Sequence, residues 1–551
     1  MSSTFFFDEG PRFDEPTPLI APRSLDHNIQ IEVERRAYTT PYHPAFLWVE
    51  PSVFNEWRTG RRRDIFHRPL SFAALLARTE SVGAGFKELG IAAGDRVLVC
   101  APHSLELSVA VAALQRIGAV PVLVDRWTGV DVLAVCARQT RPRAIVAPAA
   151  AYSLFSSIPE LRDAAIRVTL GSSSPSSSTD FASLLQNKVA CAIEPVNPED
   201  IALVTYHVVN RRVYGAHRSH QVLRAQAEAF DTITQADDRR IQLSVSPTFA
   251  FGNLTRGVTT ILPVIDPHHP DRFDGQALVE QMRATEASSC VLSPELLRAL
   301  SESASRRVEL LPSLKRVFSI GLPLSRDDVV ALELVLPRAR LQVLYGTFEV
   351  EPIAHIPAEE IPASTLDGIP IGAIAPGLDA KLMRFHRGPI RRFRSWSQWE
   401  AIDEPGELVL RGDHVCARVD ADQTEDHSHE LFDDQGNRWH RTGDMCRVDE
   451  RGQLHVLGRL ENTIMRDGKL VFNTVAETLM NRLPSIEASA LIGVPDEVLG
   501  HRVAAVFKAR RDADPELVRD DIARVLKDAG VPVDEIGPVA TIPVRPDDDP
   551  S

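Results

Sequence analysis

The sequence predicts an α/β protein with a large N-terminal domain and a small C-terminal domain. Amphipathic helices alternate with short, nearly all-apolar strands over residues 71–352, as a parallel sheet covered on both faces requires. Strand-like pieces separated by Gly and Pro turns then replace the helical periodicity over about 353–457. With 551 residues, 44% of them hydrophobic, the chain can bury several cores.

A first α/β unit is expected over about residues 71–170. The predicted elements are helix 72–89, strand 96–102, helix 105–117 and strand 119–125. The apolar run at 107–124 is interrupted by Gln115, Arg116 and Gly118. These interruptions favour a buried helix followed by a strand over a membrane span.

A second α/β unit is expected over about residues 180–352. The predicted elements are strand 202–206, helix 221–232, strand 242–246, helix 275–285 and strands 316–320 and 342–345. Ser219 precedes the helix at 221 and is expected to cap it, since a hydroxyl there accepts from free helical N–H groups. The polar run GSSSPSSST at 171–179 is interpreted as a flexible connection between the two units.

The remaining segments complete the predicted architecture. Residues 1–70 are expected to form an N-terminal extension that packs on the large domain, which spans 71–457 and includes a β-rich part at about 353–457. Residues 458–551 are expected to form a small, truncated α+β domain. Its predicted elements are helix 475–483, strands 488–494 and 502–508, and helix 515–529.

Charge and cysteine content exclude several classes of protein. The formal charge is −14, from 61 Lys and Arg against 75 Asp and Glu, whereas a sequence-independent nucleic-acid binder needs a basic surface. The six cysteines show no C-x-x-C spacing, so neither a zinc ribbon nor a disulfide framework is indicated. The N-terminal stretch lacks the features of a secretory signal. A cytoplasmic protein with small-molecule partners and no membrane span is expected.

Five short stretches occur in an order that resembles the adenylate-forming (AMP-binding) superfamily of acyl-CoA synthetases, luciferases and peptide-synthetase adenylation domains. They are GDRVLV at 94–99, LQRIGAVP at 114–121, YGTFE at 345–349, RTGD at 441–444 and GR at 458–459. Four further stretches are most similar to the fatty-acid-CoA-ligase-like and olefin β-lactone synthetase branch. They are SPTFAFG at 246–252, VIDPHHP at 264–270, SIGLP at 319–323 and residues 396–412.

The resemblance implies an enzyme that places a substrate carboxylate on the α-phosphate of ATP, releases pyrophosphate and forms an acyl-adenylate. It implies that Glu349 holds Mg²⁺, that Asp444 binds the ribose, and that Arg459 lies at the nucleotide near the domain hinge. Tyr345 would face the adenine, with Gly346 and Thr347 beside it. Gly321 would line the base pocket. Taken singly, each of these motifs also fits an ordinary turn.

The phosphate-binding loop of the family is degenerate in this chain. After strand 202–206 the resemblance calls for a Ser/Thr/Gly-rich run with a lysine, but the chain reads YHVVNRRVYGAHRSH at 206–220. Of that loop only Gly215 is retained, and β-branched residues stand where a backbone must approach phosphate closely. His207, Arg211 and Arg212 are the polar residues left in it. The two arginines either replace some lost charge or form a solvated face.

A second departure lies at the C-terminus, where the family places a lysine that contacts both the carboxylate and the α-phosphate. No lysine follows Lys527, and Arg545 stands in a different context. Losing one preorganised donor typically costs on the order of 10²- to 10³-fold in rate, so weak adenylation is expected. Phe249, Phe251 and Gly252 are candidates for the wall of an acyl pocket.

Three functional hypotheses remain open from the sequence. The first is a divergent ligase that activates a fatty or 3-hydroxy acid with Mg²⁺ and ATP, and passes the acyl group to CoA, a carrier protein or the substrate's own hydroxyl. The second is a catalytically inactive pseudoenzyme or scaffold of the same fold. The third is an enzyme that uses the AMP and acyl pocket on a preformed adenylate or thioester, which requires no pyrophosphate cradle.

Overall fold

The computed structural model describes most of the chain between residues 27 and 539. The described residues are 27–124, 129–171, 178–187, 189–209, 212–234, 240–264, 274–305, 311–321, 323–362, 366–388, 390, 395–401, 403–416, 418–421 and 429–539. Most of the predicted connection at 171–179 lies outside them. In the part of the chain that they cover, no helix is both long and apolar enough to cross a membrane.

The first large sheet has the strand order β19-β9-β8-β4-β3-β5-β6-β7, and is parallel from β8 to β7. Its strands are β3 (Arg96–Val99), β4 (Val120–Leu123), β5 (Ala144–Pro148), β6 (Ile166–Leu170), β7 (Thr179–Asp180), β8 (Ile201–Val209), β9 (Arg212–Ser219) and β19 (Arg418–Ala421). The helices from this part of the chain are α3 (Phe72–Glu88), α4 (Leu105–Arg116), α5 (Val130–Thr140), α6 (Ala151–Phe155), α7 (Pro159–Arg162) and α8 (Phe181–Leu184).

The second large sheet has the order β17-β18-β21-β22-β16-β15-β14-β13-β12-β10-β11-β1-β2, with β20 (Glu430–Phe432) paired to β21. Its α/β part contains β10 (Ile241–Ser244), β11 (Thr259–Ile261), β12 (Ser289–Leu292), β13 (Arg316–Ile320), β14 (Arg340–Thr347) and β15 (Val350–Pro357). The helices here are α9 (His220–Thr234), α10 (Pro247–Arg256), α11 (Gly275–Ala284), α12 (Pro294–Ser305), α13 (Arg326–Val335) and the 3₁₀ turn η1 (Ala358–Glu360).

One end of this sheet is the predicted β-rich part and the other end belongs to the N-terminal segment. The β-rich part contains β16 (Ile369–Ile374), β17 (Leu378–Met383), α14 (Trp396–Trp399), β18 (Gly406–Gly412), β21 (Arg438–Val448) and β22 (Leu454–Arg459). The N-terminal segment contributes α1 (Gln30–Thr39), β1 (Pro44–Trp48), α2 (Pro51–Arg58) and β2 (Arg68–Ser71). Residues 27–70, the described part of the segment before residue 71, are therefore built into the large domain, whereas residues 1–26 of the predicted extension lie outside the described residues.

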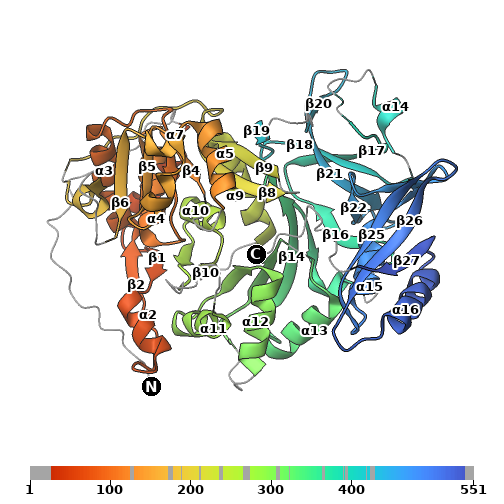
Figure 1. Ribbon diagram of the computed structural model, residues 1–551. Coiled ribbons are helices and arrows are strands. Elements are labelled where there is room, and N and C mark those ends of the chain that lie inside the picture. Colours follow the sequence, from red (N-terminus) through yellow and green to blue (C-terminus); the bar gives the residue numbers. More distant parts are fainter. Residues whose placement is uncertain are drawn as a thin grey trace.

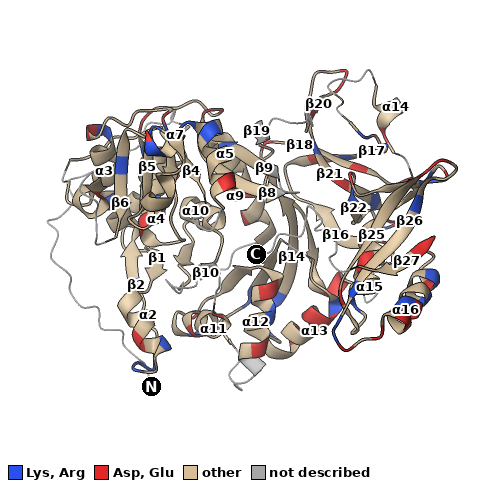
Figure 2. Ribbon diagram, in the orientation of Figure 1, with Lys and Arg blue, Asp and Glu red and all other residues tan. Residues whose placement is uncertain are grey.

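A small α+β domain follows β22 and stands beside the large domain (Figure 1). It contains β23 (Ile464–Arg466), β24 (Lys469–Val471), α15 (Asn473–Asn481), β25 (Ile486–Asp496), β26 (Gly500–Ala509), α16 (Pro515–Asp528) and β27 (Glu535–Pro538). Its own apolar core includes Ile464, Met480, Phe507 and Ile522. Acidic and basic residues alternate along α16 and are interspersed over the rest of the ribbon (Figure 2).

The predicted fold class is confirmed, and the boundary between the two α/β units differs from the prediction in one respect. Strands β8 and β9 follow residue 180 in the chain, yet β8 pairs with β4 in the first sheet. Val204 and Val213 from these strands pack in the core of that sheet, which explains the placement. The predicted helix cap is present, because the Ser219 hydroxyl accepts from the Val222 backbone N–H at 3.2 Å.

Candidate active site

A cleft of about 970 Å³ lies where the carboxyl ends of strands from both large sheets meet. The residues after β3, β4, β10 and β13 line it, namely Pro102, His103, Val124, Val245, Ser246, Gly321 and Pro323. Open α/β sheets bind ligands at the carboxyl ends of their strands. The topology of this chain therefore makes the cleft the principal candidate site.

The cleft gathers the residues that the sequence motifs pointed to. Gly321, Tyr345, Gly346, Thr347, Glu349, Asp444, Arg459 and His207 all line it. Gly321 has a φ of +91°, and a Cβ there would meet no atom within 4 Å. The space beside the Gly321 backbone, on the side where a Cβ would project, is therefore empty.

Asp444 is held from two sides. Arg459 Nη1 donates to Asp444 Oδ1 at 2.8 Å, and the hydroxyl of Tyr345 donates to Oδ2. The antiparallel pairing of β21 with β22 places Asp444 directly opposite Arg459. Each carboxylate oxygen retains a second lone pair, so this buried group can still accept a hydroxyl.

Glu349 is a buried carboxylate on the same wall, 7% exposed. Burial raises its pKa, and the positive charge of Arg459 opposes that shift. It forms no ion pair with any residue in the described ranges, where no cluster of three or more metal-binding side chains occurs either. A lone carboxylate suits Mg²⁺, which proteins hold through one or two carboxylates together with substrate phosphates and water.

The segment expected to carry the degenerate phosphate loop is a β-hairpin. β8 and β9 pair as far as Val209 opposite Arg212, so the strands continue almost to the turn. Arg211 lies outside the described residues, and the side chain of Arg212 does as well. Gly215 pairs with Tyr206, where an added Cβ would lie 2.9 Å from Cε1 of the tyrosine ring. The segment is therefore a pair of extended strands and not a Gly-rich loop.

His207 projects from the hairpin into the cleft. Its ring stacks on Phe348 with 4.9 Å between the centroids, and its Nε2 lies 3.2 Å from Thr205 Oγ1. Desolvation, with a smaller contribution from Arg218, lowers the pKa of His207 to about 3. The side chain is therefore neutral at pH 7 and supplies no charge for phosphate.

Four further polar residues line the cleft that the sequence motifs did not indicate: His103, Thr205, Arg218 and Glu351. Arg218 donates to Thr205 Oγ1 at 2.7 Å and to the Phe348 carbonyl at 2.6 Å. His103 places Nδ1 3.3 Å from the Val245 carbonyl, and burial lowers the pKa of His103 to about 4. A polar residue directly after a predicted apolar strand was the available signal for His103.

The candidates for an acyl pocket lie on one turn of α10. Phe249, Phe251 and Gly252 line a second cavity of about 40 Å³, which shares Thr248 and Glu351 with the cleft. The Phe249 ring packs edge-on against Phe230 of α9, with 4.8 Å between the centroids. The cavity is therefore lined by residues of α1, α4, α9 and α10, and it borders the cleft.

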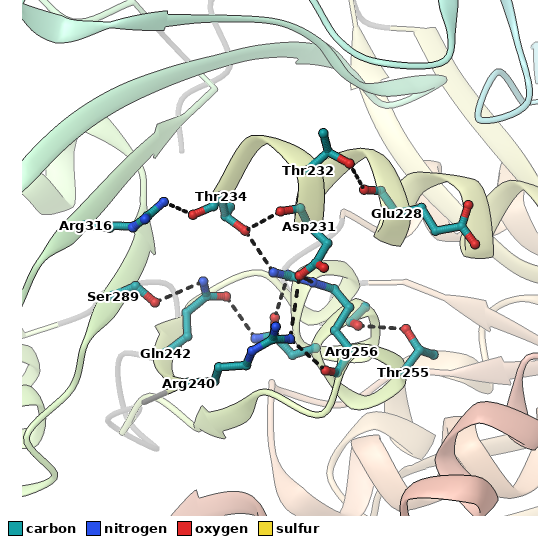
Figure 3. A network of polar contacts seen from close by, with 12 residues as sticks. Glu228, Asp231, Thr232, Thr234, Arg240, Gln242, Thr255, Arg256, Ser289 and Arg316 are labelled. Carbon is teal, nitrogen blue, oxygen red and sulfur yellow. Dashed lines mark hydrogen bonds and ion pairs between the residues drawn. The ribbon is translucent and has the colours of Figure 1, made fainter. Parts of the chain in front are cut away.

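A polar network fixes α10 against α9 and the second sheet (Figure 3). Arg256, near the end of α10, donates to Asp231 Oδ1 at 3.0 Å and to Thr234 Oγ1 at 2.9 Å. Gln242 of β10 accepts from Asn253 Nδ2 at 2.9 Å. These contacts fix the helical wall of the second cavity.

The chain is similar in sequence to known adenylate-forming proteins. The sequence model of the family described as AMP-binding enzyme matches residues 33–207 and 215–418, and the interruption coincides with the tip of the β8–β9 hairpin. Olefin beta-lactone synthetase of Stenotrophomonas maltophilia (strain K279a) is 25% identical over 440 residues, covering 77% of this chain and 78% of that protein. The 4-coumarate–CoA ligase-like protein 6 of Oryza sativa subsp. japonica is 27% identical over 472 residues, covering 78% and 72%.

Solved structures share the fold. ATP-bound MatB from Rhodopseudomonas palustris superposes with a TM-score of 0.73 at 20% sequence identity, covering 94% of this chain and 96% of that one. The family model covers more than half of the chain. The chain therefore belongs to the AMP-binding enzyme family, the adenylate-forming superfamily that includes the olefin β-lactone synthetases.

Proposed function

We propose that this chain is a divergent adenylate-forming ligase, which binds AMP tightly and ATP weakly and acts on the carboxylate of an acid bound beside Glu349. The observation that carries the proposal is the convergence of Tyr345, Glu349, Asp444 and Arg459 on one cleft. The carboxylate of Asp444, oriented by Tyr345 and Arg459, suits the vicinal hydroxyls of a ribose.

The chain's own residues suggest how the reaction would proceed. The carboxylate of the acid attacks the α-phosphorus of ATP, an acyl–phosphate bond forms, and the bond to pyrophosphate breaks. Arg459 lies close enough to contribute positive charge at this centre. Glu349 would hold Mg²⁺, which supplies charge stabilisation for the phosphates when bound. We propose CoA or a carrier protein as the acceptor of the acyl group.

The hairpin supports a low affinity for the β- and γ-phosphates. β8 and β9 are an extended antiparallel pair, with Val208 opposite Val213, and not a loop in which successive backbone N–H groups converge on an anion. Val208 also presents a branched, 41% exposed side chain at this position. A second candidate function follows from this observation, namely a reaction on a preformed acyl-adenylate or thioester.

Isothermal titration calorimetry with AMP and with Mg·ATP tests the proposal, using wild type, Asp444→Ala and Asp379→Asn. Asp379 pairs with Arg411 on the surface of the same β-rich part and serves as the matched control. We expect micromolar AMP affinity in wild type and Asp379→Asn, its loss in Asp444→Ala, and at least 10-fold weaker binding of ATP.

The opposite results discriminate between the hypotheses. No heat from either nucleotide would contradict the ligase and support a scaffold. ATP binding as tight as AMP binding would show that the hairpin does not impair recognition of the β- and γ-phosphates. Pyrophosphate release upon addition of a carboxylic acid would then separate a ligase from an enzyme that uses preformed adenylates.

A further inference from the structure

Glu351 occupies the boundary between the cleft and the small cavity lined by α1, α4, α9 and α10. It lines both, and Thr248 of α10 is the other residue common to the two. Glu349, in the turn between β14 and β15, and Glu351, in β15, line the same cleft. A ligand that extends from Glu349 into the small cavity therefore passes Glu351.

The carboxyl group of Glu351 lacks a partner of its own. In the described part of the chain no side chain or backbone group donates a hydrogen bond to it or forms an ion pair with it. Arg218, which lines the same cleft, donates to Thr205 and to the Phe348 carbonyl. A half-buried carboxyl in this state gains free energy from any ligand that donates a hydrogen bond to it.

The small cavity limits the size of that ligand. Its volume is about 40 Å³, whereas one water molecule needs roughly 10 to 15 Å³ by a comparable measure. The cavity accommodates a short substituent and is too small for a long hydrocarbon chain. One wall of the cavity is α10, which the Arg256 contacts to Asp231 and Thr234 hold in place (Figure 3).

We infer that Glu351 is a specificity-determining residue, and that it selects a short carboxylic acid bearing a hydrogen-bond-donating group, a hydroxyl or an ammonium, on the carbons next to the carboxylate. This inference rests on the proposed function, because that function places the acid's carboxylate in the cleft beside Glu349. Glu351 accepts the hydrogen bond from the donor group, and the remaining carbons enter the cavity beside Phe249 and Gly252.

Acyl-sulfamoyl-adenosines test the inference, because they mimic the acyl-adenylate and bind without any chemical step. The set comprises the butanoyl, 2-hydroxybutanoyl, 3-hydroxybutanoyl, 3-aminobutanoyl and tetradecanoyl compounds. Dissociation constants are measured by calorimetry for wild type, Glu351→Leu and Glu351→Gln, with AMP as the reference ligand for each. Glu351→Leu removes the carboxyl group, and Glu351→Gln keeps an acceptor oxygen without the charge.

We expect wild type to bind at least one hydroxy or amino compound about 10-fold or more tightly than the butanoyl compound, and to bind the tetradecanoyl compound weakly. Glu351→Leu should lose this preference while its AMP affinity stays unchanged. Glu351→Gln should retain a preference for a hydroxyl and lose one for an ammonium, which identifies the donor group.

Other outcomes overturn the inference in distinguishable ways. If AMP binds but wild type does not prefer any hydroxy or amino compound over the butanoyl compound, Glu351 does not select a donor group and the proposed function stands. Tight tetradecanoyl binding would contradict the size limit. If neither AMP nor any of the analogues binds, the proposed function and the inference are both wrong.

Discussion

The hydroxyl of Tyr345 donates a hydrogen bond to Oδ2 of Asp444, although the two residues are 99 positions apart in the sequence. The bond joins β14, in the centre of the second sheet, to β21 in its β-rich part. Burial and the neighbouring Asp444 carboxylate raise the pKa of Tyr345 well above its ordinary value, so the phenol remains a donor. The contact therefore holds the candidate ribose-binding carboxylate in one orientation.

Tyr345→Phe should reduce the free energy of unfolding by about 1.5 to 3 kcal/mol, because it removes a hydrogen bond to a charged group. Urea denaturation followed by circular dichroism measures the change. Tyr42→Phe is the matched control, since that side chain is 86% exposed. Equal stabilities for the two variants would show that the Tyr345 hydroxyl contributes nothing to the fold.

Glu407→Gln should destabilise the protein by about 3 to 5 kcal/mol, since it leaves the buried guanidinium of Arg441 without its counter-charge. Glu407 Oε2 accepts from Arg441 Nη2 at 2.6 Å, and the two side chains are 1% and 7% exposed. Glu487→Gln is the control. It breaks the surface pair with Lys508, whose side chains are 49% and 43% exposed, and should cost less than about 1 kcal/mol. Similar losses in the two variants would contradict the prediction.

Acid should weaken the β20–β21 turn through Asp433. Asp433 accepts hydrogen bonds from Trp439 Nε1 at 3.0 Å and from the Asn437 backbone N–H at 2.8 Å. These and related bonds lower its pKa to about 2, although burial acts in the opposite direction. Because the folded-state pKa is depressed, the stabilisation is present above the ordinary aspartate pKa near 4 and is lost as the pH falls towards 2.

The experiment compares urea midpoints at pH 5 and pH 3 for wild type, Asp433→Asn and Asp434→Asn. Wild type and Asp434→Asn should lose more stability over this interval than Asp433→Asn, by at most about 2 kcal/mol. An identical pH dependence in all three proteins would rule out Asp433 as a contributor.

The six cysteines should be unreactive in the folded protein. All of them are free thiols and buried. Burial raises the pKa of Cys136 and Cys290 to about 12 and that of Cys416 to about 11, so the reactive thiolate is scarce at pH 8. A disulfide-exchange reagent should label almost no thiol in buffer and all six in concentrated guanidinium. Rapid labelling of the folded protein would indicate local opening around one of them.

Local sequence signals predicted most of the regular elements, and they indicated candidate nucleotide-binding residues that line one cleft. Helix 105–117 and strand 316–320 match α4 and β13 closely, since apolar periodicity and a capping Ser or a Gly mark their ends. Asp444 and Arg459 were indicated by short motifs, and the pairing of β21 with β22 places them opposite each other. Helices, strands and short motifs are predictable in this way because each depends on residues that are close together in the chain.

The hairpin and the inner lining of the cleft were not predicted. Val208, Val209 and Val213 were interpreted as obstacles to a phosphate loop, whereas their β-branched side chains also favour extended strands. Glu351 stands within a mostly apolar strand and carries no local signal. Its position at the boundary of two cavities depends on α10, about a hundred residues earlier in the chain, and such long-range packing has no local signature.

The pairing of β1 with β11 has a consequence for the newly made chain. Phe46 lies opposite Thr260 in a parallel register. The β1–β11 pairing therefore cannot form until the residues of β11, which are synthesised much later, are available. At a synthesis rate of roughly 5 to 20 residues per second, the delay is on the order of 10 to 40 seconds. During that interval the apolar residues of β1, Phe46 above all, have no strand partner on their β11 side. The ribosome-bound chain should therefore recruit a chaperone at this segment until β11 emerges.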